Sequence, residues 1–450
     1  MLQSPSRIFH RTINAQLPIA TGSEGVYVRD NQGNRYLDAC GGAAVSCLGH
    51  GHSRVINSIK RQLDAIAYVH SGFFTSEASE QLAQFLAQRA PEGIEHAYFV
   101  SGGSEAVETA LKMARQYFLE LGQPSKQKFI ARRQSYHGNT LGALSVSGNK
   151  WRRQQFEPML MDIEHISPCY AYRDQREAET VRDYGLRVAN ELDAKIEAMG
   201  AENVIAFIAE PIVGATGGAV VPVPGYFKRI REICDKHNVL LILDEVMCGM
   251  GRTGSLFACE QESVRPDIIT MAKGLAAGYQ PIGATLCSNQ IYDQFRDGSG
   301  VFQHGHTYVG HATACAAALA VQQTIEDDNL LDNVNRMGEM LNLALRHRFA
   351  EHPFIGDIRG RGLFRAVELV ADRETKAPLP PELSIAAEIK RQGMAQGLAC
   401  YPNSGTIDGV QGDHVLLAPP YIVNSSHIEE IADKLCLAVN AALKTKGMMS

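Results

Sequence analysis

The chain has 450 residues, of which 45% are hydrophobic and 20% charged, and its formal net charge is −6 with a pI of about 6.2. This balance is ordinary for a globular protein with a large core, and the length alone suggests about three domains. The sequence has no basic tract and no apolar run near the ~20 residues that span a bilayer, so nucleic acid and membranes are not expected partners.

The N-terminal part carries two opposing signals. Its first 23 residues contain no acidic residue and include Arg7 and Arg11, which suggests a transit peptide. The segment nevertheless runs directly into two predicted strands, at residues 26–28 and 36–37, around a Gly33 turn. We therefore expect it to belong to the fold. The ten cysteines are scattered without a CxxC pair, which indicates a reduced, cytoplasmic protein.

Small residues and histidines follow. The run at residues 41–45 allows either close approach of a ligand to the backbone or a plain tight connection. His50 and His52 have no third ligand close by in the sequence, so no metal site is predicted there. A helix is predicted over residues 55–67.

A candidate anion site follows the next predicted strand, residues 97–100. A Gly-Gly-Ser turn that includes Gly103 and Ser104 leads into a helix predicted over residues 104–120. Unpaired N–H groups and the helix dipole favour negative charge at such a helix start, so a phosphate could bind. The alternative is an ordinary serine cap.

Further strands are predicted at residues 128–131 and 204–209. The first leads to Tyr136 and His137, and an aromatic ring in this place can either stack on a cofactor or belong to the core. The second ends at Glu210.

Near the centre of the chain, two apolar runs are each followed by a polar residue. Residues 239–243 are followed by Asp244 and Glu245, and residues 268–271 are soon followed by Lys273. Such runs are typical of buried parallel strands, whose carboxyl ends meet at one edge of a sheet. A lysine there can form a Schiff base with pyridoxal phosphate, and an aspartate can keep its ring nitrogen protonated. On these residues alone, a chance pairing in another α/β enzyme is equally open.

The loop after Asp244 also satisfies the pattern GxGxxG, at residues 249–254. A dinucleotide fingerprint requires these glycines to open a helix in the first strand–helix unit, whereas here no helical period follows and many strands precede. We therefore do not predict nicotinamide binding.

In combination these motifs resemble the signature of the class III, or ω-type, pyridoxal-phosphate aminotransferases. The resemblance covers nearly the whole chain and is carried by LILDEVMCGMGRTG at residues 241–254, RPD at 265–267, MAKGL at 271–275 and PIGA at 281–284. It implies that Asp244 binds the pyridine nitrogen and that Lys273 is the Schiff-base residue, and these two are the predicted catalytic residues.

The resemblance also implies the rest of the cofactor site. Tyr136 and His137 correspond to the Tyr-His-Gly motif that supplies a stacking aromatic, and Thr307 corresponds to a threonine that reaches the cofactor phosphate of the neighbouring subunit. No metal is expected, and the residues predicted to bind pyridoxal phosphate are Gly103, Ser104, Tyr136, His137, Glu210, Asp244, Val246, Lys273 and Thr307.

Four positions depart from the family pattern, and one is Gly102, which lacks the hydroxyl that begins the family's Ser-Gly-Ser or Ser-Gly-Thr triplet. Ala215 stands where members that use 2-oxoglutarate carry a switch glutamate, which favours pyruvate as the acceptor, and His306 replaces a common phenylalanine. Gln411 precedes Gly-Asp-His where amine:pyruvate relatives place a carboxylate-binding arginine. That arginine is therefore either absent or elsewhere, with Arg361 and Arg365 as guesses.

The fold implied is α/β, of the fold type I architecture: a large domain with a mostly parallel sheet of the seven-stranded type, and a smaller α/β domain from both termini. The predicted division is residues 1–60 (N-terminal segment of the small domain), 61–329 (large cofactor-binding domain) and 330–450 (C-terminal small domain). Because Thr307 would serve the neighbour's cofactor, a homodimer or larger assembly with shared active sites is implied.

The expected activity is transamination, in which an amino group moves from an amine or ω-amino acid to an oxo acid, with pyruvate favoured, by a ping-pong mechanism. Two alternatives stay open: a decarboxylase of the dialkylglycine decarboxylase type, and a 2-oxoglutarate-using diamine or ω-amino acid aminotransferase. A non-catalytic protein on this scaffold is disfavoured because Asp244 and Lys273 are both present. The sequence does not identify the amino donor.

Overall fold

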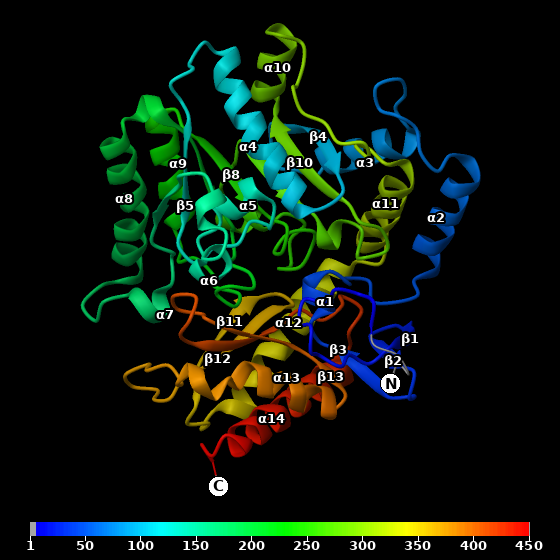
Figure 1. The fold of residues 1–450 in the computed structure, drawn as a ribbon, viewed down its shortest axis with the longest axis vertical. Coiled ribbons are helices and arrows are strands. Elements are labelled where there is room, and N and C mark those ends of the chain that lie inside the picture. Colours follow the sequence, from blue (N-terminus) through cyan, green and yellow to red (C-terminus); the bar gives the residue numbers. More distant parts are fainter. Residues whose placement is uncertain (1–5, 450) are drawn as a thin grey trace.

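The computed structural model describes residues 6–449 and contains three β-sheets. In Figure 1 the largest sheet and its helices form the upper part, and the two smaller sheets form the lower part, where both labelled ends of the chain lie. Within residues 6–449, no helix is long and apolar enough to cross a membrane.

The large sheet has seven strands in the order β4-β10-β9-β8-β7-β5-β6. Neighbouring strands are parallel except that β10 runs antiparallel to both β4 and β9. The strands are β4 (Ile94–Val100), β5 (Lys128–Arg132), β6 (Glu164–Ile166), β7 (Val204–Ala209), β8 (Leu240–Asp244), β9 (Ile268–Met271) and β10 (Gly283–Ser288).

Helices cover both faces of this sheet, which explains why β7 and β8 are apolar along almost their whole length. Leu241 and Leu243 of β8 pack into one core with α3, α8, α9 and α11, whereas Ile242 packs into another with α4, α5 and α10. The bounds are α3 (Glu77–Ala87), α4 (Gly103–Glu120), α5 (Leu141–Val146), α6 (Lys150–Arg153), α7 (Ala171–Asp174), α8 (Val181–Met199), α9 (Tyr226–His237), α10 (Asn289–Asp297) and α11 (Ala312–Asp327).

The two smaller sheets join the N-terminal and C-terminal parts of the chain. In one, the order is β1-β2-β3-β13, and β3 pairs in parallel with β13; in the other it is β11-β12-β15-β14. The strands are β1 (Ala20–Glu24), β2 (Tyr27–Asp30), β3 (Arg35–Asp38), β11 (Ile355–Arg361), β12 (Phe364–Leu369), β13 (Leu398–Ala399), β14 (Tyr401–Ser404) and β15 (Asp413–Leu417).

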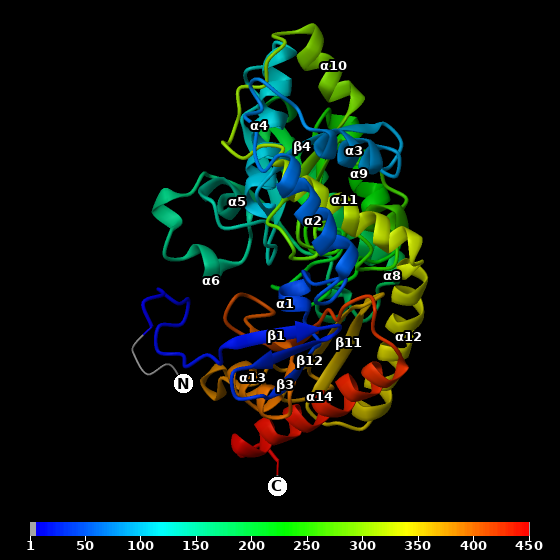
Figure 2. The ribbon, with the colours of Figure 1, turned by 90° about the vertical axis from the view of Figure 1, so that its right-hand side faces the viewer.

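One apolar core holds Leu37 and Val55 together with residues of the C-terminal helices, so the two ends of the chain fold together. Figure 2 shows α14 lying beneath these strands. The helices are α1 (Gly41–Ala44), α2 (Ser53–Ala65), α12 (Leu330–Phe349), α13 (Ile385–Ala395) and α14 (Ser425–Thr445), and short 3₁₀ turns lie at Glu157–Met159, Ala201–Asn203, Ala258–Glu262, Lys273–Leu275 and Pro381–Leu383. The proposed boundaries after residues 60 and 329 stay a prediction.

Two local features differ from the sequence-based expectation. The small-residue run forms a helical turn, α1, but Gly42 and Ala43 have φ values of 57° and 82°, in the left-handed region. His50 does have a carboxylate neighbour, because its Nε2 lies 3.2 Å from Oδ2 of Asp38 on β3. That partner comes from a strand twelve residues earlier, which the local sequence pattern did not reveal.

Candidate active site

A cavity of about 490 Å³ lies at the carboxyl ends of the parallel strands. Asp244 ends β8, Glu210 follows β7, and Lys273 follows β9, so the sheet itself brings these three side chains together. Eight residues predicted to bind the cofactor line this active-site cavity: Gly103, Ser104, Tyr136, His137, Glu210, Asp244, Val246 and Lys273.

Asp244 is held in place by two donors. Its Oδ2 lies 2.7 Å from Nδ1 of His137, and its Oδ1 accepts a hydrogen bond of 3.0 Å from the backbone N–H of Val246. Asp244 and His137 are both 3% exposed, so the pair is shielded from water. Since a carboxylate accepts and does not donate, Nδ1 of His137 carries the proton in this hydrogen bond. The other ring nitrogen, Nε2, has no hydrogen-bond partner among residues 6–449.

Lys273 begins the 3₁₀ turn after β9 and is half-buried, with its side chain on the cavity wall. Its φ of 46° lies in the left-handed region, which is unusual for a residue with a side chain and is typical of functional sites. Burial lowers the pKa of the Lys273 amine, while the charges of Asp244 and Glu210 oppose the shift. A lowered pKa makes more of the amine neutral and therefore nucleophilic.

Glu210 is a buried carboxyl group with one free acceptor. Its Oε1 accepts a hydrogen bond of 3.2 Å from the backbone N–H of Gly214, and its Oε2 has no partner among residues 6–449. Burial raises the pKa of Glu210. An orphaned polar atom on the wall of a cavity indicates a position where a bound polar group would be satisfied.

The start of α4 forms a cradle with no side chain at its centre. A Cβ atom at Gly103 would lie 2.9 Å from Cγ1 of Val246, so only glycine fits against that residue. Ser104 is tied to the neighbouring loop, because its Oγ accepts a hydrogen bond of 3.0 Å from the backbone N–H of Asn139. The positive end of this 18-residue helix faces the cavity wall. The cradle, the free acceptor of Glu210 and the free Nε2 of His137 suit a compact anion attached to a polar ring.

Tyr136 is half-buried and lines the same cavity, and the guanidinium carbon of Arg152 lies 4.5 Å from the centre of its ring. Thr307 does not line the cavity of its own chain. It is exposed, and its carbonyl oxygen accepts a hydrogen bond of 2.9 Å from the hydroxyl of Tyr68. The role predicted for Thr307, contact with the cofactor phosphate of a neighbouring subunit, therefore requires a second copy of the chain.

The structure places neither guessed arginine in the active-site cavity. Arg361 is ion-paired with Glu262 at 2.8 Å, and Arg365 donates to the carbonyl oxygens of Gly360 and Gly362 at 2.8 and 3.0 Å. Ala215 lines the active-site cavity.

Sequence reasoning missed Arg359, which supports the turn that carries Ala215. From β11, its Nη2 and Nε donate to the carbonyl oxygens of Gly217 and Gly218, both at 2.6 Å. Its Nη1 also lies 2.5 Å from Oε2 of Glu368 on β12. The local pattern gave no signal that separates Arg359 from Arg361, because both lie on the same face of β11 and each has Gly360 beside it.

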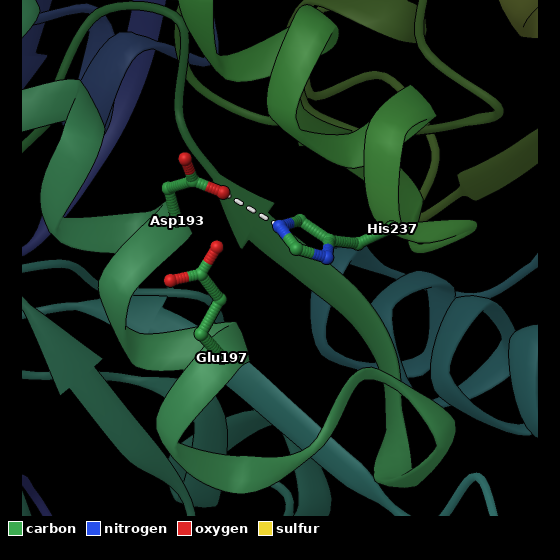
Figure 3. A group of neighbouring side chains, drawn as sticks. All are labelled: Asp193, Glu197 and His237. Carbon is green, nitrogen blue, oxygen red and sulfur yellow. Dashed lines mark hydrogen bonds and ion pairs between the residues drawn. The ribbon is translucent and has the colours of Figure 1, made fainter.

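One group of side chains has the spacing of a metal site, but it is an ion-pair cluster. Asp193, Glu197 and His237 lie together on α8 and α9, and Nε2 of His237 is 2.5 Å from Oδ1 of Asp193 (Figure 3). The ammonium of Lys236 lies 2.9 Å from Asp193 and 3.1 Å from Glu197. It already supplies the positive charge that these carboxylates require.

The fold and the cavity together define an α/β enzyme of the fold type I class, with a lysine and an aspartate at one rim of the sheet. Residues 10–439 match the family described as aminotransferase class-III. The chain therefore belongs to the class III aminotransferases, which are pyridoxal-phosphate-dependent enzymes, and the predicted family, fold class and enzyme class are confirmed.

Three similar proteins illustrate the match. An uncharacterised aminotransferase of Schizosaccharomyces pombe is 44% identical over 97% of this chain and 95% of its own length. The putrescine–pyruvate aminotransferase of Pseudomonas aeruginosa is 35% identical, with coverage of 94% and 91%. The solved ω-transaminase of Pseudomonas jessenii in complex with PMP has a TM-score of 0.90 and 33% identity, and the alignment covers 96% of this chain and 94% of that one.

Proposed function

We propose that this chain binds pyridoxal phosphate in the active-site cavity and transfers an amino group from an amine or ω-amino acid to an oxo acid, with pyruvate as the acceptor. The observation that carries the proposal is the placement of Lys273, Asp244 and Glu210 around one cavity beside the Gly103 cradle. The solved transaminase in complex with PMP supports a cofactor of this class. When bound, pyridoxal phosphate supplies an aldehyde for attachment and an electron-withdrawing ring.

Each residue then has a distinct part. Lys273 would hold the cofactor through its amine, and once the amino donor had displaced that amine it would be placed to accept the proton from the donor's carbon and to deliver it elsewhere in the site. Asp244, aligned by His137, keeps a negative charge at the ring-nitrogen end. Gly103 and Ser104 cradle the phosphate at the start of α4, and Tyr136 offers a ring face for stacking. Val246, next to Asp244, packs beneath the cradle.

The choice of pyruvate rests on Ala215 and on the similarity to the putrescine–pyruvate aminotransferase. A glutamate in place of Ala215 would offer a partner for an arginine in the cavity; alanine offers none. A second copy of the chain completes the site in this proposal, because Thr307 is exposed, and two phenylalanines, Phe73 and Phe74, are 81% and 67% exposed and available for such a contact.

The test detects the covalent bond between the Lys273 amine and the cofactor. We expect the purified protein to show a visible absorption band that borohydride abolishes, and a Lys273→Ala variant to show no such band and no amino transfer. A Lys228→Ala variant on the exposed surface of α9 serves as the matched control and should behave as the parent. Full amino transfer by a folded Lys273→Ala protein would contradict the assignment. Faster turnover with 2-oxoglutarate than with pyruvate would contradict the acceptor, and carbon dioxide release matching product would favour the decarboxylase alternative.

A further inference from the structure

A second cavity, of about 500 Å³, lies behind the active site and shares no lining residue with it. We call it the basic cavity. Four parts of the chain meet there: the loops that follow β5 and β6, the helices α7 and α8, the turn at residues 213–220, and the loop at residues 406–408.

The charge on its wall is strongly unbalanced. Two acidic residues, Asp174 and Asp408, face five cationic ones, although the chain as a whole has a net charge of −6. The cationic residues are Arg133, Lys150, Arg173, Arg176 and Arg187.

Two of the five cations are neutralised within the protein. Arg173 is paired with Glu368 and Arg187 with Glu179, both at 2.5 Å. Asp408 is engaged in its own loop, where its Oδ1 accepts hydrogen bonds of 2.8 and 2.7 Å from the backbone N–H groups of residues 410 and 411. Of the two acidic residues on the wall, Asp174 makes no ion pair within residues 6–449: burial raises the pKa of its carboxyl group, and the nearby charges of Arg133 and Arg187 oppose that shift. The three remaining cations therefore still outnumber the acidic charge that faces them.

The other three cations have no carboxylate within 4.0 Å in the part of the chain that the structure describes. Arg133 is held at the wall by neutral acceptors, the carbonyl oxygen of His165 at 3.4 Å and the hydroxyl of Ser167. Lys150 and Arg176 are exposed and make no side-chain hydrogen bond within that range. Cationic groups that cluster at one cavity without an anionic partner favour binding of an external anion.

Several other residues of the wall are apolar, so the cavity suits a ligand that has a less polar body as well as negative charge. Pro168, Tyr170, Val188, Val213 and Val220 line the interior of the basic cavity. A volume of about 500 Å³ lies within the range of small-molecule sites. We propose that the basic cavity binds an organic polyanion, a small molecule that bears phosphate or carboxylate groups on a less polar body.

The turn at residues 213–220 lies between the two cavities and is hydrogen-bonded to the loop that follows β5. Val213 and Gly217 face the basic cavity, and Ala215, between them in the chain, faces the active site. The hydroxyl of Thr216 donates to the carbonyl oxygen of Gln134 at 2.5 Å, and Gln134 lies two residues before Tyr136. A polyanion in the basic cavity therefore contacts the turn that shapes the substrate side of the active site.

Binding is tested on the protein loaded with its cofactor, so that the cofactor's own phosphate site is filled. Calorimetric titration at low salt with pyrophosphate, ADP and citrate separates three contributions: charge alone, phosphate on an organic body, and carboxylates. We expect saturable binding that weakens with added salt, with ADP or citrate binding more tightly than pyrophosphate. The better of the two then identifies the anionic group.

A triple variant, Arg133→Gln, Lys150→Gln and Arg176→Gln, should weaken binding by more than about tenfold, since three charge-assisted hydrogen bonds are lost. The control, Lys228→Gln, Lys390→Gln and Lys444→Gln, changes the net charge equally at exposed lysines outside the cavity and should bind as the parent.

The effect on the active site has a separate readout. Because this part of the inference rests on the proposed function, we expect the bound polyanion to change the KM for the oxo acid while the cofactor's absorption band stays unchanged. No saturable binding by the parent up to about 10 mM, or equal binding by the parent and the cavity variant, would overturn the proposal whatever the outcome of the amino-transfer assays.

Discussion

Replacing Arg359 by methionine removes the group that ties β11 to the turn beside the active-site cavity. Its guanidinium donates to the carbonyl oxygens of Gly217 and Gly218 at 2.6 Å, and lies 2.9 Å from Asp357 and 2.5 Å from Glu368. The Arg359 side chain is only 9% exposed, so water cannot replace these contacts. The change leaves two carbonyl oxygens without their donor and removes half of an ion pair.

The expected loss follows from those contacts. Breaking a buried ion pair by removing one partner costs about 3–5 kcal/mol. Glu368 stays partly compensated, because Arg173 still lies 2.5 Å away. We therefore expect the free energy of unfolding to fall by about 4 kcal/mol, a large fraction of the total stability of a typical protein.

Urea unfolding of the parent and variants measures this loss. Arg359→Lys keeps the charge beside Glu368 but not the planar fork that reaches two carbonyl oxygens, so about half of the loss should return. Arg54→Met is the matched control, because Arg54 and its partner Asp327 are 39% and 58% exposed and their pair should contribute about 1 kcal/mol or less. If Arg359→Met unfolded within about 1 kcal/mol of the parent, the reasoning from buried contacts would be refuted. In the folded variant, we expect KM for the oxo acid to rise more than kcat falls.

Three further predictions concern the cavity and its surroundings. Asp244→Asn keeps the shape but removes the charge beside His137, so kcat/KM should fall by about 10³-fold, and a fall below tenfold would argue against its assigned part. Gly103→Ala places a methyl group 2.9 Å from Val246, so titration of the cofactor-free protein should show affinity for pyridoxal phosphate reduced by about tenfold or more, with helix content unchanged by circular dichroism. Burial raises the pKa of Glu245 to about 7, against about 4.3 in an unfolded chain. The folded form therefore binds more protons in that interval, and this residue lowers stability by roughly 4 kcal/mol as the pH rises through it. Urea midpoints of Glu245→Gln across this pH range should show a flatter profile than the parent, and identical slopes would disprove the effect.

Much of the fold follows from local patterns. The strands that end at Asp244 and before Lys273 and the helix that begins at Gly103 lie within a residue or two of their predicted positions. Each is a short apolar run or a helical period bounded by turn residues, and such signals act over neighbouring residues. The convergence of their polar ends follows because parallel strands present their carboxyl ends at one rim.

The contacts of individual side chains, unlike the secondary-structure elements, do not follow from local patterns. Arg361 and Arg365 were plausible carboxylate binders in the sequence, but strand β11 directs Arg361 to Glu262, and Arg365 is engaged by nearby carbonyl oxygens. Arg359, two residues before Arg361, is the one that reaches the turn beside the cavity. Because residues two apart in a strand share a face, alternation does not separate Arg359 from Arg361; the segments packed against each position along β11 decide which partner each arginine meets.

By itself, the sequence determined the strands that lead to Asp244 and Lys273 and the helix that begins near Gly103, because local hydrophobic periodicity and turn chemistry encode them. The type of sheet and the roles of Asp244 and Lys273 were implied by the resemblance to the class III family. Only the tertiary structure decided that His137 pairs with Asp244 across 107 residues, that Arg359 supports the turn of Ala215, and that five cations surround a separate cavity. These features depend on side chains brought together by packing between distant segments, and no short-range pattern carries that information.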